Sequence, residues 1–145
     1  MISYFPLIES GNFGLKLLQR RGWIECWHDR QIRAGEEWRG RIDGNLEEAH
    51  IILFLVSADF LASDYCYDVE VKRALERHAT GSARVIPVIA RDVNWRAAPF
   101  SHIQVLPQDG RPVVGWPGGR DSAWRGVAEG IEAAIESFRR LHPSV

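Results

Sequence analysis

The stretch that decides the fold is residues 50–78, HIILFLVSADFLASDYCYDVEVKRALERH. It opens with an unbroken apolar run at residues 51–56, which ends at Ser57. The run is too short to indicate an isolated helix and is rich in residues that favour strands. Strands that are apolar throughout are buried on both faces, as in a parallel sheet. After a short loop, the apolar spacing predicts a helix from Asp64 to about His78, closed by Gly81.

Outward from this stretch, strands and helices alternate. We expect strands at residues 2–4, 23–27, 51–56, 83–90 and 112–116. We expect helices at residues 13–21, 36–49 and 64–78, and a last amphipathic helix capped by Asp121 or Ser122. This order predicts an α/β fold: a flavodoxin-like, doubly wound, five-stranded parallel sheet with helices on both faces.

Three details qualify this outline. Pro87 makes the strand at 83–90 imperfect, because proline has no N–H to donate to a neighbouring strand. The last helix should bury one apolar face, made of Val127, Ile131, Ala134, Ile135 and Phe138. The long irregular segment 91–111 is of a length that is usually functional or that contains a short helix.

Composition narrows the class of protein. With 145 residues, 46% hydrophobic and 26% charged, the chain is expected to form a single globular domain, residues 1–145. Its net charge of −1 argues against nucleic-acid and membrane-surface partners. Cys26 and Cys66 form no repeated pattern, and no signal peptide is recognisable, so we expect a cytoplasmic protein. The five histidines lack metal-ligand spacing, and no metal site is expected.

Short motifs, taken in order along the chain, resemble the TIR domain (Toll/interleukin-1 receptor domain) in its short bacterial form. These are ISY at 2–4, WHDRQI at 27–32, GEEW at 35–38, AHIIL at 49–53, FLAS at 60–63, Tyr65-Cys66 and RVIPV at 84–88. Each is weak alone, and their common order is specific. Two features depart from the family, and the first is the N-terminal segment. The segment between Tyr4 and Trp27 looks short, and apolar residues 5–8 replace the polar residues expected after the first strand.

The resemblance implies cleavage of NAD⁺ at the bond between nicotinamide and ribose, with NAD⁺ as substrate and no cofactor. Nicotinamide leaves as a neutral molecule, so no general acid is required. The developing ribosyl cation needs one well-placed negative charge, and the remaining demand is for positioning. Ordinary glycoside hydrolysis differs, because it usually employs two carboxylates.

Glu70 is the candidate catalytic carboxylate, and it is also the second departure. Enzymatic members of the family place a glutamate three residues after the cysteine, where this chain has Val69. A shift of one residue turns a helical side chain by about 100°. The apolar stripe of the predicted helix consists of Tyr67, Val71, Ala74, Leu75 and His78. Glu70 would lie roughly 95° from the centre of this stripe, on its flank. The plain alternative is a solvated glutamate, and Asp68 is the reserve carboxylate.

The resemblance also implies a set of residues that contact the dinucleotide: Ser3, Tyr4, Asp29, Arg33, Gly35, Trp38, Ser57 and Tyr65. Tyr65 would wall the nicotinamide pocket. In the loop 29–35, Asp29 would bind a ribose hydroxyl, and Arg30 or Arg33 a phosphate. Each has a plain alternative. Tyr65 would be an aromatic that packs at the rim, the loop 29–35 would be charged and solvated, and Ser57 would form a hydrogen bond within a turn.

Three functions compete. The first is an NAD⁺-consuming enzyme, a hydrolase or cyclase, activated by homotypic self-association in bacterial immune or toxin signalling. The second is a non-catalytic TIR module that only binds other TIR domains; the shifted glutamate and the unusual first segment favour it. The third, a phosphoreceiver or flavin protein, is disfavoured, because residues 55–57 and 4–6 lack the aspartates that a receiver requires.

Overall fold

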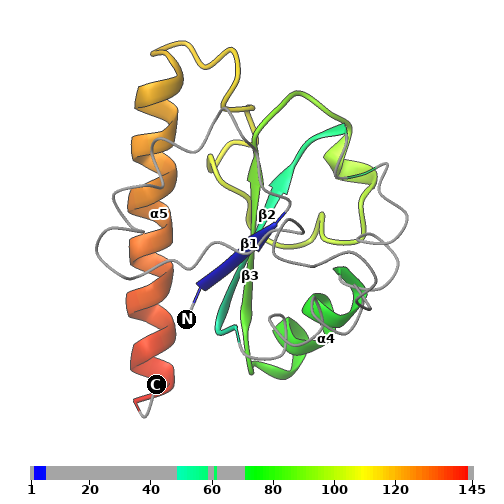
Figure 1. Ribbon diagram of the computed structural model, residues 1–145, viewed down its shortest axis with the longest axis vertical. Helices are drawn as coiled ribbons and strands as arrows, with labels where there is room; N and C mark the ends of the chain where they lie inside the picture. The colour runs from blue at the N-terminus through cyan, green and yellow to red at the C-terminus, as the bar shows by residue number, and fades with distance from the viewer. Residues whose placement is uncertain (1, 6–48, 59–60, 62–70, 144–145) are drawn as a thin grey trace, which may run out of the picture.

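The computed structural model describes residues 2–5, 49–58, 61 and 71–143 (Figure 1). Its elements are β1 Ile2–Phe5, β2 Ile51–Val56, α4 Lys72–Thr80, β3 Arg84–Ile89, the 3-10 helix η3 Trp95–Ala97 and α5 Arg120–Leu141. The expected strand at 23–27 and the expected helix at 13–21 lie outside the described residues, as do Cys26 and Cys66. The expected helix at 36–49 also lies outside them, except for Ala49, which is not helical. The expected strands at 2–4, 51–56 and 83–90 are confirmed.

The described strands form one parallel sheet in the order β1-β2-β3. In the register, Ile51 of β2 lies opposite Ile2 of β1 and opposite Arg84 of β3. All six residues of β2 are buried, which explains why the strand is apolar throughout. The central place that the sequence assigns to this strand is therefore confirmed.

Each face of β2 contributes to a separate core cluster. Ile51, Leu53 and Leu55 belong to the cluster that contains the buried face of α5. Ile52, Phe54 and Val56 belong to the other cluster, with Val71 and Ala74 at the start of α4. Figure 1 shows α5 on one side of the sheet and α4 on the other. Helices on both faces, as expected, therefore cover a sheet whose side chains alternate between two cores.

The strand expected at residues 112–116 is not present, and this prediction was wrong. In its place, Leu106 forms a single parallel bridge with Val88. The Leu106 N–H donates to the Pro87 carbonyl at 2.8 Å, and the Ile89 N–H donates to the Leu106 carbonyl at 2.8 Å. Val113 follows, with its N–H 2.9 Å from the Ile89 carbonyl. Within the described part of the chain, the sheet therefore has three strands and one bridge at the outer side of β3.

Pro87 and Leu106 together limit the pairing on the outer side of β3. Arg84 and Ala90 donate their N–H groups toward β2, to the carbonyls of His50 and Val56. The direction of the backbone N–H alternates along a strand, so the N–H positions of residues 85, 87 and 89 point to the outer side of β3, away from β2. Position 87 has no N–H there, so a strand that paired with β3 before Leu106 would lose a rung of its ladder. Residues 112–116 come after Leu106, whose bridge already takes the Ile89 N–H, so they reach only the end of β3, where Val113 and Val114 donate to the carbonyls of Ile89 and Ala90.

The last helix begins slightly earlier than the sequence indicated. Gly119, with φ of 89°, is the N-cap of α5, and no side chain caps the helix. Asp121 and Ser122, the expected caps, lie inside the first turn, where the Asp121 charge still favours the helix N-terminus. Val127, Ile131, Ile135 and Phe138 are buried as expected, and Ala134 is half-buried. None of the described helices is long and apolar enough to cross a membrane.

The segment 91–111 contains the short helix η3, as its length suggested. It is anchored by Phe100, which is fully buried and packs edge-to-face on Phe54, with ring centroids 5.6 Å apart. Gly110 closes the segment with φ of 79°. A Cβ at this position would lie 2.6 Å from the Trp95 ring, so glycine allows the close approach.

Candidate functional site

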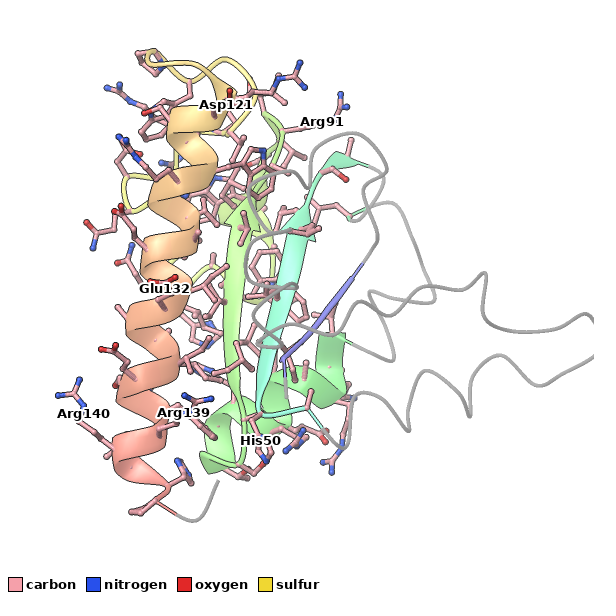
Figure 2. The ribbon with its side chains drawn as sticks, turned by 60° about the vertical axis from the view of Figure 1, so that its left-hand side comes forward. His50, Arg91, Asp121, Glu132, Arg139 and Arg140 are labelled. Atoms are coloured by element: carbon pink, nitrogen blue, oxygen red, sulfur yellow. The ribbon has the colours of Figure 1, made fainter. Side chains whose placement is uncertain are left out.

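The candidate site lies at the edge of the sheet where the parallel strands end. Phe5, Val56 and Ile89 are the last residues of β1, β2 and β3. In open α/β sheets, ligands bind beyond this edge. Figure 2 shows Arg91 and Asp121 at this end of the molecule, whereas His50, Arg139 and Arg140 lie at the opposite end.

Ser57 is the predicted ligand-contacting residue whose surroundings are best described. It directly follows β2 and is buried, with 6% of its surface exposed. Its carbonyl accepts a hydrogen bond from the Leu61 N–H at 3.1 Å, so the chain turns immediately after the strand. This geometry fits the turn role, and contact with a dinucleotide remains a prediction.

Ser3 and Tyr4 lie in β1, next to the central strand. Their register partners in β2 are Ile52 and Leu53. The structure therefore brings the first strand beside the strand that ends at Ser57. The remaining candidates lie outside the described residues: Asp29, Arg30, Arg33, Gly35, Trp38, Tyr65, Asp68 and Glu70.

The helix that follows Glu70 in the sequence confirms the stripe that was used to place this residue. Val71 and Ala74 are buried against the sheet, and Leu75 and His78 are half-buried. The core face of α4 is thus the predicted one, so far as the described residues define it. The helix ends at Gly81, whose φ of 80° is the left-handed conformation typical of a helix C-terminus.

Arg77 anchors the far end of α4, and the sequence reasoning missed it. It is 8% exposed, although it is charged. Its guanidinium donates to the Ala49 carbonyl, to the Ser82 carbonyl at 3.0 Å and to Ser82 Oγ at 3.3 Å. Ala49 precedes β2 and Ser82 precedes β3, so one side chain ties α4 to the start of both strands. Its position three residues after Ala74 on the apolar stripe was the available signal.

His78 completes the anchor from the same helix. Its Nδ1 accepts a hydrogen bond from the Val85 N–H at 3.0 Å. This N–H lies on the outer side of β3, so the imidazole occupies a position that a neighbouring strand would otherwise use. Burial, followed by the positive charges of His102 and Arg84, lowers the pKa of His78. The neutral ring, with its proton on Nε2, is therefore the form that this contact selects.

The described geometry defines a class: an α/β protein with a parallel sheet, helices on both faces and a candidate site at the carboxyl edge. Comparison with known families identifies the family within this class. Residues 15–111, more than half of the chain, match the family described as TIR domain. The chain therefore belongs to the TIR domain family, and the resemblance noted from the motifs is confirmed.

One known protein is similar in sequence to most of this chain. The chain is 50% identical over 126 residues to an uncharacterized protein, y4lF, of Sinorhizobium fredii (strain NBRC 101917 / NGR234). The aligned region covers 87% of this chain and 39% of that protein. The chain thus spans well under half the length of this relative. No solved structure matches the chain significantly.

Proposed function

We propose that this TIR domain cleaves NAD⁺ at the nicotinamide–ribose bond and releases ADP-ribose or its cyclic form. Membership of the TIR family carries the proposal, because the matched region contains the central strand, Glu70 and all of α4. The family includes NAD⁺-cleaving enzymes. The chemistry needs one carboxylate near the ribosyl cation, and this segment supplies Glu70, with Asp68 in reserve.

The packing of α4 fits the flank position that the proposal gives to Glu70, which itself lies outside the described residues. Val71, its neighbour in sequence, is buried against the sheet, and Arg77 and His78 hold the far end of the helix. A helical residue that precedes Val71 would be turned about 100° from it, toward a flank of the helix. We assign Glu70 to the carboxyl edge of the sheet, where the substrate is expected.

The complete proposal includes the parts of the domain beyond the described residues. The predicted strand at 23–27 lies among those residues, and the flavodoxin-like sheet that the family implies would include it. Asp29, Arg33, Gly35 and Trp38 would then follow this strand toward the same edge. We propose that the domain acts in the cytoplasm, in bacterial immune or toxin signalling, and that homotypic self-association completes its site.

The test is release of nicotinamide from NAD⁺ by purified protein, at high concentration with a crowding agent. Wild type should be active, and Glu70→Ala and Glu70→Gln should abolish the release while the domain stays folded. The matched control is Glu76→Ala, because Glu76 is exposed on the same helix and pairs only with exposed Arg73, at 3.3 Å, among the described residues. This control should retain wild-type activity.

Two other outcomes would change the assignment. An active, folded Glu70→Ala variant would move the catalytic role to Asp68. No release by wild type, in a sample shown to be assembled, would favour a non-catalytic TIR interaction module.

A further inference from the structure

The three arginines of the segment 91–111 differ in their partners. The Arg96 guanidinium lies over the Trp95 ring, 4.7 Å from its centroid. Arg111 pairs with Asp109, with its Nε 3.2 Å from Oδ2. The exposed guanidinium of Arg91 has neither an ion pair nor a hydrogen bond in the described part of the chain. Of these three cations, Arg91 is therefore the one that a ligand can engage without breaking an existing contact.

The backbone of Arg91 is held at the carboxyl edge of the sheet. Its N–H lies 3.3 Å from the Val56 carbonyl, which also accepts from Ala90 at 3.0 Å. That carbonyl belongs to the peptide that leads into Ser57, so Arg91 stands directly beside the end of the central strand. Figure 2 shows its side chain projecting beyond the end of β3. A fixed backbone with a free, extended side chain suits the capture of an anion at this edge.

NAD⁺ carries a diphosphate between its two nucleosides. Guanidinium binds phosphate oxygens through two parallel hydrogen bonds, more specifically than ammonium does. Asp92 follows Arg91 and is exposed, but the two form no ion pair in the structure. We propose that Arg91 binds the diphosphate of NAD⁺ and thereby sets the preference for a dinucleotide over the phosphate-free nucleoside. This inference rests on the proposed function and adds a binding residue at the same site.

The experiment compares wild type, Arg91→Ala, Arg91→Lys and Arg125→Ala. Arg125 is an exposed arginine in α5, beyond the first turn of that helix, and serves as the matched control. Steady-state nicotinamide release is measured with NAD⁺ and with nicotinamide riboside, which lacks phosphate. The Kd for ADP-ribose is measured separately by calorimetry, so that binding is observed without turnover.

For Arg91→Ala, we expect the KM for NAD⁺ and the Kd for ADP-ribose to rise about ten-fold, as for loss of a charged hydrogen bond. The kcat and the KM for nicotinamide riboside should not change, because Arg91 is assigned no contact with the reacting bond. Arg91→Lys should recover part of the binding, and Arg125→Ala should behave as wild type.

The outcomes separate this inference from the proposed function. If wild type cleaves NAD⁺ and Arg91→Ala matches Arg125→Ala in KM and Kd, the role of Arg91 is overturned and the enzyme stands. If wild type binds ADP-ribose but releases no nicotinamide, the activity is overturned. A weaker Kd in Arg91→Ala would then still support the diphosphate contact. If wild type neither binds nor cleaves, both are overturned.

Discussion

At the scale of single residues, His78 links the structure to pH. Its Nδ1 accepts the Val85 N–H, and only an unprotonated nitrogen can do so. Burial is the main cause of its lowered pKa, ahead of the charges of His102 and Arg84. The folded protein therefore resists protonation of His78, whereas the unfolded chain takes up the proton near the ordinary histidine pKa of 6.5. The contribution of neutral His78 to the free energy of unfolding is therefore complete above pH 6.5. It is lost as the pH falls from 6.5 toward the lower pKa of His78 in the folded protein.

We accordingly expect the free energy of unfolding to fall between about pH 7.5 and about pH 5.5, and His78→Gln to reduce that fall. Glutamine offers an oxygen that can accept from Val85 and does not titrate. Urea denaturation of both proteins at the two pH values measures the difference. An identical pH dependence in the variant would show that other groups, such as His50, whose pKa burial also lowers, account for the whole effect.

Single residues also show where sequence reasoning reaches its limit. The buried stripe of α4 was predictable because burial repeats with the helical period, and Val71 and Ala74 confirm it. The burial of Arg77 depends on carbonyls at residues 49 and 82, which become neighbours only in the fold. Likewise, Arg91 cannot be told from Arg96 or Arg111 in the sequence, because only their partners distinguish them.

At the scale of elements, the helix α5 approaches the sheet through a glycine. A Cβ at Gly130 would lie 2.7 Å and 2.9 Å from the two Cδ atoms of Leu106. Leu106 is the residue that bridges to β3, so this glycine lets the helix pack against the shortened outer edge of the sheet. Gly126, one turn earlier on the exposed side, has open space around it.

The two glycines therefore make a matched pair. Gly126→Ala should raise the free energy of unfolding by up to about 1 kcal/mol, because alanine favours helix more than glycine does. Gly130→Ala gains the same preference but crowds Leu106, and we expect it to be about 1–3 kcal/mol less stable than Gly126→Ala. Denaturant melts of both variants measure this. Equal stabilisation would mean that Leu106 moves aside without cost.

The same edge explains the one strand that was predicted wrongly. Residues 112–116 contain the strand-favouring pair Val113 and Val114, and this local preference was the basis of the prediction. Pairing, however, requires open hydrogen-bonding groups on the neighbouring strand, and Leu106 already takes the Ile89 N–H and the Pro87 carbonyl on the outer side of β3. His78 also occupies the Val85 N–H of that side. The hydrogen-bonding groups left open on β3 therefore decided the structure of residues 112–116, rather than the strand preference of those residues.

At the scale of the whole molecule, the sheet separates two cores, and the candidate site lies at the edge they share. One core packs against α5, and the other packs against α4 and the segment 91–111. The alternating burial of β2 was predictable from its six apolar residues, since both faces had to be covered. The site itself could be placed only by edge and by family, because its chemistry depends on residues from several distant segments.

Self-association is the whole-molecule property that the proposed function predicts. If neighbouring domains complete the site, the rate of NAD⁺ cleavage per molecule should rise with protein concentration instead of staying constant. Dilution should lower it reversibly, in step with the assembled fraction measured by sedimentation. The assembled state is favoured by mass action, so a saturating concentration should give a plateau. A rate per molecule that is independent of concentration, in a sample that sediments as a monomer, would show that one domain contains the entire site.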